Sequence, residues 1–528
     1  MPSRPRHRAW RRYSRRIGAG LVATLAPLLV AACTVGPSAT PSLVVAGSAP
    51  ATPSPTGPHG PLPLPSLEQS TGQLGWTDCT DETTQRLGMP APPQGMAFQC
   101  ARLIGPIDPS NTDQDSGGQR ISLLKVGTGA TPLVVVNDLD GLPGTLYAAR
   151  LAAQLPAQFL STFSLIGMDR RGSAGSAGAH CVPQADRNTM IQADPNDQNL
   201  DSLLNATTDA EQQCVLALSS SMAQYNTKNT VADLDLVRQS LGVNHLDAIG
   251  HGEGSRVLTS YADQYPAHVG RFVLDGSPDP VLSNQDTAQA QAAGAQATFA
   301  AFAQNCATTG CPLGADPTGA VNQLVSTVRQ APMAAGGIQL TAGVVLRAIL
   351  IGLADRSQWG ALATDIQQAI GGDGSALAAL ISPDLVGTPQ DPPRIDADLV
   401  AGCNDVTDRL SPGQVATDMK NWSGKNPLFG ALYAQNLLLC GPWPVPSQPL
   451  PKPNAPNTPP ILVISTASDP RTPAPGTQRT AQTLDSGVLL TWAGAGHGAL
   501  GQSSCATSAA QNYLIGGKVP AGGTACPP

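Results

Sequence analysis

Short uninterrupted apolar runs alternate with amphipathic stretches through the first half of the chain. Leu133 to Val136 and Phe163 to Met168 are continuous apolar runs, which are typical of strands buried on both faces. Tyr147 to Leu155 and Thr230 to Leu241 have the apolar spacing of helices. A third apolar run, Leu246 to Ile249, precedes another helical stretch. This alternation predicts an α/β domain with a mostly parallel central sheet.

The pattern changes after residue 284. Residues 285–455 are rich in Ala and Gln, with helical periodicity and no convincing buried strand. The strand pattern returns at Ile461 to Ile464 and at Val488 to Trp492. We therefore expect one α/β domain, formed by residues 67–284 and 456–528, that is split by a large helical cap insertion over the carboxyl edge of its sheet.

The first 66 residues indicate export. Residues 1–33 hold seven arginines and then an apolar stretch of signal-peptide length, ending Val30-Ala31-Ala32-Cys33. These four residues resemble a bacterial lipobox, which predicts a lipid anchor on Cys33 and a location at the cell membrane or envelope. The alternative is an ordinary signal peptide with a chance cysteine. Residues 34–66 are rich in Pro, Ser and Thr and are expected to form a tether.

Charge and cysteine content narrow the function classes. Removing the seven leader arginines takes the formal charge from −7 to −14, which argues against nucleic-acid binding. There is no CxxC pair and the histidines are scattered, so we expect no metal site and no cofactor. Beyond Cys33 ten cysteines remain, which predicts five disulfides in an oxidising compartment.

The pairing of these cysteines is expected to follow a preference for near neighbours, although sequence alone does not determine the connectivity. This preference pairs Cys79 with Cys100, Cys181 with Cys214, Cys306 with Cys311, Cys403 with Cys440 and Cys505 with Cys526.

The segment Gly250-His251-Gly252-Glu253-Gly254 has the frame of a nucleophile elbow, G-x-S-x-G, with Gly252 at the position of the serine. An apolar run precedes it and a helical stretch follows. This is the strand–turn–helix context that such an elbow requires. The segment therefore predicts the elbow's backbone without its nucleophile.

An acid and a histidine follow in the order expected for a catalytic triad. Asp469 comes directly after the strand at Ile461, and His497 lies between glycines after the next strand. In such a triad the acid orients the imidazole, and the imidazole accepts the proton of the nucleophile. The alternative for Asp469 is a turn-capping aspartate before a proline.

Several segments together resemble the secreted tripeptidyl-aminopeptidase-like serine peptidases of the α/β-hydrolase superfamily. These are Gly167-Met168-Asp169-Arg170-Arg171-Gly172 with Ser176, the helix from Asp233 to Arg238, Leu274 to Asp279-Pro280, and the segments around Asp469 and His497. The resemblance extends from Trp76 to Cys526. It implies an α/β-hydrolase fold and relatives that remove short peptides from substrate N-termini.

The departures from this family lie at the reaction centre. The family's elbow reads roughly Gly-Tyr-Ser-Tyr-Gly, and its oxyanion loop reads roughly Asn-Pro-Gly-Gly-Pro-Gly. Here the second segment begins Asn137-Asp138-Leu139-Asp140. The backbone N–H groups of Glu253 and Asp138 take the oxyanion-hole positions, but their carboxylates would oppose a developing oxyanion if they pointed inward. We therefore expect an electronegative pocket.

Two functions fit this pattern. One is a peptide-binding envelope protein whose peptidase site has decayed, with peptide or protein N-termini as ligands. The other is an active peptidase or esterase that uses a water activated by His497 or an unusual nucleophile. Ser255 is no substitute, because it lies about one helical turn beyond the elbow. The cap residues Asp405, Arg409 and Trp359 are candidates for peptide contacts or for structural roles, and no oligomeric state is predicted.

Overall fold

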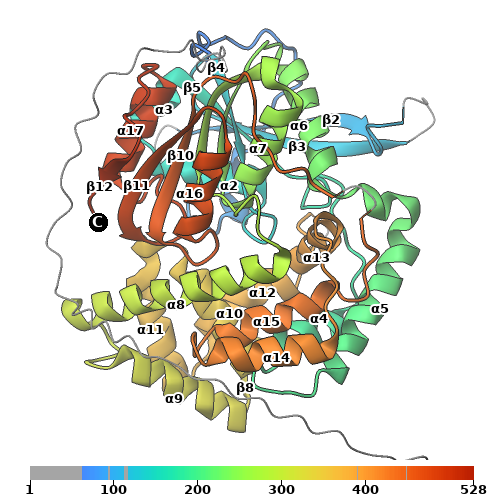
Figure 1. The fold of residues 1–528 in the computed structure, drawn as a ribbon, viewed down its shortest axis with the longest axis vertical. Coiled ribbons are helices and arrows are strands. Elements are labelled where there is room, and N and C mark those ends of the chain that lie inside the picture. Colours follow the sequence, from blue (N-terminus) through green and yellow to red (C-terminus); the bar gives the residue numbers. More distant parts are fainter. Residues whose placement is uncertain (1–61, 93–95, 112–116, 389, 447–448) are drawn as a thin grey trace, which may run out of the picture. The chain divides into compact units, whose positions relative to one another are not determined.

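The computed structural model describes residues 62–528, apart from residues 93–95, 112–116, 389 and 447–448 (Figure 1). The chain divides into two units, Met1–Pro58 and His59–Pro528, and all described residues belong to the second. The expected signal peptide, the lipid anchor at Cys33 and most of the tether lie outside the described residues.

A sheet of ten strands forms the centre of this unit, in the order β1-β2-β3-β5-β4-β6-β7-β10-β11-β12. From β5 to β12 all neighbouring strands are parallel, whereas β1, β2 and β3 join in antiparallel pairs. The strands are β1 (Thr77–Asp78), β2 (Phe98–Pro106), β3 (Gly118–Val126), β4 (Thr131–Val136), β5 (Phe163–Met168), β6 (Leu246–His251), β7 (Val269–Asp275), β10 (Ile461–Ser468), β11 (Gly487–Ala495) and β12 (Thr524–Cys526). The expected α/β class with a mostly parallel sheet is confirmed.

Helices cover both faces of the sheet, as its continuously apolar strands require. In β4, Leu133 and Val135 pack toward one helical layer, and Val134 and Val136 pack toward the other. The first layer contains α2 (Gly144–Gln154), α3 (Ala157–Thr162) and α17 (Ser504–Leu514). The second contains α6 (Thr227–Leu241), α7 (Glu253–Gln264) and α16 (Ala474–Thr483). The short helix α1 (Thr80–Arg86) follows β1.

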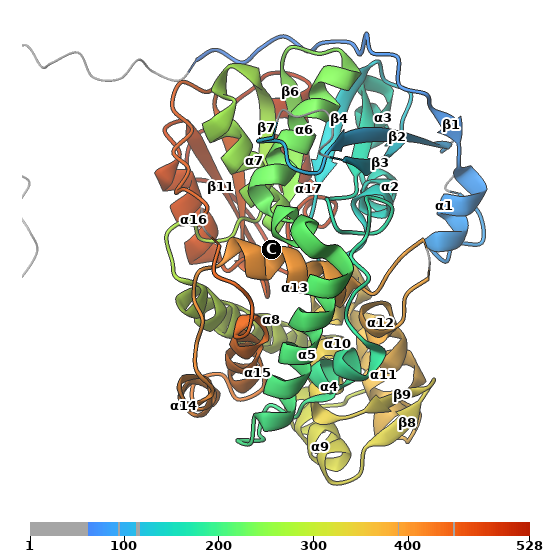
Figure 2. The same cartoon turned by 90° about the vertical axis from the view of Figure 1, so that its right-hand side faces the viewer.

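The cap has a hydrophobic core of its own, separate from the two cores of the sheet. It lies below the sheet in Figure 1, and Figure 2 shows α13 between the sheet and the rest of the cap. Its helices are α4 (Gln184–Gln192), α5 (Asp201–Leu218), α8 (Asn284–Thr309), α9 (Pro317–Gln330), α10 (Ala342–Leu353), α11 (Trp359–Ile370), α12 (Ser375–Leu385), α13 (Arg394–Asp405), α14 (Pro412–Ser423) and α15 (Gly430–Asn436). Short 3-10 helices span Ser219–Gln224, Pro266–His268, Arg356–Gln358 and Leu437–Cys440.

The cap differs from the expected insertion in two ways. Helices α4 and α5 belong to its core although they precede the elbow, in the range assigned to the α/β part. Their buried side chains face cap helices, and the disulfide Cys181–Cys214 joins the start of α4 to α5. The cap also contains a small antiparallel hairpin, β8 (Met333–Ala335) with β9 (Ile338–Leu340), where no strand was expected. Three residues per strand are too few to leave a pattern of alternation.

All five expected disulfides are formed, with the near-neighbour pairing. Two of them tie the edges of the sheet, and three tie neighbouring elements within the cap or at its border. The sheet pairs are Cys79 with Cys100 and Cys505 with Cys526, and the cap pairs are Cys181 with Cys214, Cys306 with Cys311 and Cys403 with Cys440.

The two members of each pair differ in burial. One cysteine belongs to a core of the sheet or of the cap, and its partner is only partly buried; the partly buried members are Cys100, Cys181, Cys311, Cys440 and Cys505. Each disulfide therefore connects a core to the more exposed chain beside it.

Among the described residues, no helix combines the length and the apolar character that a membrane crossing demands.

A buried ion pair fastens the loop after β5 to helix α6. Arg171 donates from Nε and Nη2 to the two carboxylate oxygens of Asp233, at 2.9 and 2.8 Å. The exposed fractions of these side chains are 0% and 2%. The guanidinium also donates to the backbone carbonyls of Ile107 and Gln224. The segment from Gly167 to Gly172 and the helical segment from Asp233 to Arg238, which contribute this pair, therefore have a structural role.

We expect Asp233→Asn to lower the free energy of unfolding by about 3–5 kcal/mol, because it leaves the Arg171 guanidinium buried without its counter-charge. Arg329→Ala is the control, since it breaks a half-exposed pair with Asp194 and should cost less than about 1 kcal/mol. Chemical denaturation with the disulfides intact measures both values. Equal losses in the two variants would contradict the structural role of the buried pair.

Candidate active site

Gly252 keeps the backbone of a nucleophile elbow. It lies between β6 and α7 with φ 56° and ψ −121°, a region that side-chain-bearing residues rarely adopt. The flanking turn is tight, because a Cβ on Gly254 would lie 2.0 Å from the carbonyl oxygen of Val136. The strained turn has therefore been kept while the residue that it normally presents is absent.

The side chain of Asp138 occupies the place of the missing nucleophile. A Cβ on Gly252 would lie 2.1 Å from Asp138 Oδ1 and 2.5 Å from Oδ2. The backbone N–H of Glu253 donates to Asp138 Oδ1 at 2.7 Å. This N–H follows the nucleophile position and normally faces the developing oxyanion. The carboxylate thus fills both the nucleophile's position and part of the oxyanion hole.

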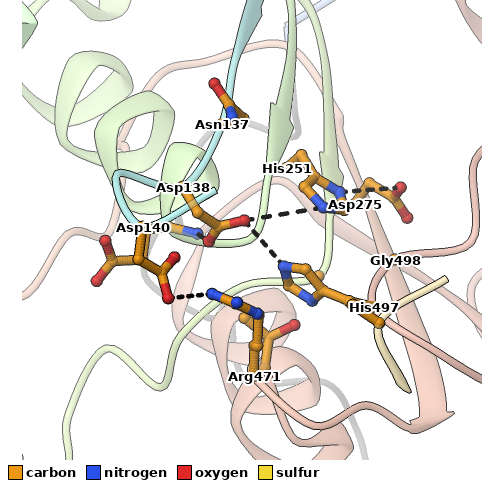
Figure 3. A network of polar contacts seen from close by, with 12 residues as sticks. Asn137, Asp138, Asp140, His251, Asp275, Arg471, His497 and Gly498 are labelled. Carbon is orange, nitrogen blue, oxygen red and sulfur yellow. Dashed lines mark hydrogen bonds and ion pairs between the residues drawn. The ribbon is translucent and has the colours of Figure 1, made fainter. Parts of the chain in front are cut away.

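His497 joins this carboxylate to the expected acid. Its Nε2 lies 2.9 Å from Asp138 Oδ2, and its Nδ1 lies 3.0 and 3.1 Å from the two oxygens of Asp469 (Figure 3). Asp469 also accepts hydrogen bonds from the backbone N–H groups of Arg471, Thr472 and Gly498. The structure therefore brings Asp469 and His497 together on the loops after β10 and β11, in the geometry expected of an acid and its base.

The two carboxylates keep His497 charged. Burial disfavours the imidazolium, but the attraction of Asp469 and Asp138 outweighs burial and raises the pKa of His497 to about 10. The same attraction lowers the pKa values of Asp138 and Asp469 despite their burial. At neutral pH His497 is therefore an imidazolium held between two carboxylates, and both of its nitrogens donate.

The loop after β4 carries a second carboxylate, which is paired by a residue of the loop after β10. Asp140 forms an ion pair with Arg471, which lies two residues beyond Asp469 (Figure 3). Asp140 and Asp138 both raise the pKa of the Arg471 guanidinium, against the effect of burial. The negative charge that Asp140 adds to this loop is thus matched by a cation within the site.

His251 and Asp275 also belong to the site, although the sequence assigned neither a role. The His251 ring stacks on Tyr147 at 4.8 Å between ring centroids and lies 4.3 Å from the ring of His497. Its Nδ1 is buried without a hydrogen-bond partner among the described residues, 3.6 Å from Asp275 Oδ2. Asp275 accepts the backbone N–H groups of Ala499 and Leu500, which joins the end of β7 to the His497 loop. The position of Asp275 at the end of a strand was the feature of the sequence that could have identified it as a site residue.

The other candidates have mainly structural contacts. The Ser255 hydroxyl donates to the carbonyls of Gly250 and Gly276 and faces away from Asp138, as expected. Arg409 binds backbone carbonyls within the cap. The buried indole N–H of Trp359 donates to Leu353 O. Asp405 caps helix α6 by accepting from the N–H and hydroxyl of Thr227 at 2.9 and 2.6 Å.

A cavity of about 600 Å³ separates this centre from the cap. Its floor contains Asp138, Glu253 and Arg471, and its roof contains residues of α10, α12 and α13. Eight carboxylates line it against four cations. The acids are Asp138, Asp140, Glu253, Asp279, Asp384, Asp398, Asp405 and Asp408, and the cations are Arg256, Arg347, Lys452 and Arg471. The expected electronegative pocket is therefore present.

Restoring the serine alone is not expected to restore catalysis. Gly252→Ser places its side chain against Asp138 and at a positive φ, which should cost about 1–3 kcal/mol of stability before any repacking. Gly252→Ser combined with Asp138→Ala opens that space and frees His497 Nε2 for the hydroxyl. A nucleophile of this kind is worth about 10⁶ in turnover, so even partial alignment should raise ester hydrolysis tenfold or more.

An active-site burst with an activated ester measures this difference. We expect no burst from the wild type or from Gly252→Ser, and a burst from the double variant that disappears on adding His497→Ala. A burst from Gly252→Ser alone would contradict the blocking role of Asp138.

Comparison with known proteins agrees with this geometry. Residues 426–526, which contain Asp469 and His497, match the family described as TAP-like protein. The chain is 29% identical to serine protease Hip1 of Mycobacterium tuberculosis, over 87% of this chain and 92% of that protein. It is 24% identical to tripeptidyl aminopeptidase of Streptomyces lividans, over 86% and 87% of the two chains.

Among solved structures, a thermophilic esterase from Thermogutta terrifontis is 13% identical and covers 78% of this chain and 97% of its own, with a TM-score of 0.37. We base the fold assignment on the strand order and on the positions of the elbow, the acid and the histidine. The chain has an α/β-hydrolase fold, its C-terminal part (residues 426–526) matches the TAP-like family, and most of its length is similar to a serine protease and to a tripeptidyl aminopeptidase.

Proposed function

We propose that this protein is an exported peptide-binding member of its family, which holds the free amino end of a peptide in the acidic cavity and lacks the serine route of hydrolysis. The observation that carries the proposal is a pair of cap carboxylates, Asp384 and Asp398. Both line the cavity, and neither forms a hydrogen bond or ion pair with a described residue. Carboxylates left without partners in a cavity favour a cationic ligand.

The charge environment of these two groups supports a cationic ligand. Burial raises the pKa of Asp384 to about 6, Arg394 opposes this rise, and Asp140 adds to it. Burial also raises the pKa of Asp398, and the charges of Asp140 and Glu253 add to this effect. An ammonium group placed between the cap and the Asp140 loop would relieve this mutual repulsion. A peptide N-terminus supplies such a group, and one relative is named a tripeptidyl aminopeptidase.

The residues at the floor of the cavity favour binding of a peptide over acyl transfer. Glycine has no atom that forms an acyl-enzyme. Asp138 is an alternative nucleophile by position, but its attack on an amide would yield an anhydride, and its charge is already compensated by His497 and the Glu253 N–H. A water activated by His497 would need a free lone pair on Nε2, which donates to Asp138 instead.

Export is supported by the disulfides. All ten cysteines of the described residues are paired, which suits an oxidising compartment outside the cytosol. The lipobox-like segment ending at Cys33 adds a lipid anchor to the proposal. Metabolic labelling with a fatty-acid analogue, compared between the wild type and Cys33→Ala, tests this anchor.

The first functional prediction concerns the amino group. We expect a tripeptide with a free N-terminus to bind at least about tenfold more tightly than its N-acetylated form, because a charged hydrogen bond is worth about 1.5–3 kcal/mol. Asp384→Asn and Asp398→Asn should reduce this preference. Asp373→Asn, which changes an exposed carboxylate just before α12, is the matched control. Calorimetry at neutral pH measures the affinities, and equal binding of both peptides would overturn the proposal.

The second functional prediction concerns pH. Below about pH 6 Asp384 takes up a proton, so the attraction to the ammonium weakens. Above about pH 8 the peptide's α-amino group loses its proton, so the attraction weakens again. Affinity should therefore be greatest between these limits and fall on both sides. The loss of peptide affinity at acidic pH should be smaller in Asp384→Asn than in the wild type. An equal loss in that variant would contradict the role of Asp384.

A further inference from the structure

Asp138, His251 and His497 place three metal-ligating groups around one point. One ring nitrogen of each imidazole and one oxygen of the carboxylate lie within 4.8 Å of one another, and all three residues are buried. Asp138 Oδ2 lies 2.9 Å from His497 Nε2 and 3.8 Å from His251 Nε2. Figure 3 shows the three side chains directed toward one another, His251 from the end of β6 and Asp138 and His497 from the loops after β4 and β11.

We propose that these three residues form a binding site for a divalent transition metal of the zinc class. A tetrahedral ion with bonds of about 2.0–2.1 Å holds its ligand atoms about 3.3–3.4 Å apart. The two separations given above lie on either side of this value. The two imidazole nitrogens lie within 4.8 Å of each other, so modest side-chain shifts would bring all three groups to coordinating distance.

The surroundings of each ligand match those of metal sites. Metal-bound histidines commonly direct the second ring N–H at a carboxylate, and bound carboxylates are themselves hydrogen-bonded. His497 Nδ1 faces Asp469 at 3.0 Å, and His251 Nδ1 faces Asp275 at 3.6 Å. The free oxygen of Asp138, Oδ1, is held by the Glu253 N–H. Each Nε2 and Asp138 Oδ2 therefore remain directed at the common point.

Two features favour a bound metal ion over a simple hydrogen-bonded pair of Asp138 and His497. His251 is 8% exposed, yet its Nδ1 has no hydrogen-bond partner among the described residues, and its Nε2 faces the carboxylate at a distance too long for a hydrogen bond. Three carboxylates, of Asp138, Asp275 and Asp469, surround two imidazoles, so the site has an excess of acid groups. A divalent cation would replace the proton on His497 Nε2 and give His251 a partner.

Asp138 also lines the cavity below the cap. Three protein ligands leave a fourth coordination position, as in zinc sites that bind water or substrate. The occupant of this position would come from the cavity. The metal site is distinct from the proposed ammonium contacts at Asp384 and Asp398, so each proposal can fail alone.

The test is titration of the chelator-treated, full-length folded protein with Zn²⁺ and with Co²⁺ in the absence of peptide. We expect saturable binding at one ion per chain, and with Co²⁺ the intense visible bands of four-coordinate geometry. His251→Gln and Asp138→Asn should each lower Zn²⁺ affinity by more than about 100-fold. Asp275→Asn, which acts through His251, should lower it by about 10–100-fold.

His180→Gln is the matched control, because His180 is exposed and outside the site. Its affinity and Co²⁺ spectrum should equal those of the wild type. Near-ultraviolet circular dichroism selects the variants that retain the native fold, and any one of the three site variants suffices for the comparison. The proposal is overturned if the wild type binds no stoichiometric metal, or if folded site variants bind Zn²⁺ as tightly as the wild type. Peptide affinity measured with chelator present reports on the cavity proposal separately.

Discussion

The carboxylate of Asp138 can occupy its position only because residue 252 has no side chain. Asp138 Oδ1 lies 2.1 Å from where a Cβ would stand, so any other residue at the elbow would displace it. The rest of the centre follows from that contact. His497 is held between two carboxylates, the oxyanion N–H of Glu253 is already occupied, and Arg471 compensates the neighbouring Asp140. The absent serine and the altered loop after β4 are thus one structural change.

The same arrangement connects the floor of the cavity with its roof. The backbone N–H of His497 donates to the carbonyl of Ala354, next to the end of cap helix α10, at 2.7 Å. Asp398 in the cap and Glu253 at the elbow influence each other electrostatically across the cavity. Charge in the cap and charge at the elbow are therefore coupled, and a ligand that neutralises one alters the other.

The apolar runs predicted the sheet well because strands buried on both faces leave little choice of residue. Phe163–Met168 matches β5 without an offset, and the acid and base loops follow β10 and β11 as expected. Strands β1 to β3 were missed, since these antiparallel strands at one side of the sheet carry a mixed pattern of buried and exposed residues. Helices α4 and α5 were not predicted, and their residues were included in the α/β part because they precede the elbow in the chain, whereas their buried side chains pack in the cap.

The candidate site was predicted as a set of positions but not as a set of contacts. Asp469 and His497 were identifiable from chain order, and Gly252 from its motif. The inward turn of Asp138 depends on loop geometry that one sequence does not reveal. The approach of His251 to His497 joins the ends of β6 and β11, which are distant in the chain, so the scattered histidines gave no metal-binding spacing.

The close fit between Gly252 and Asp138 also has an evolutionary consequence. A return of serine at 252 meets the carboxylate, whereas loss of the carboxylate alone leaves His497 facing an empty elbow. We expect each single substitution to leave the site without a working nucleophile, so the effects of the two substitutions should be strongly non-additive. Positions 138 and 252 are therefore coupled, and a change at one constrains which residue the other can carry.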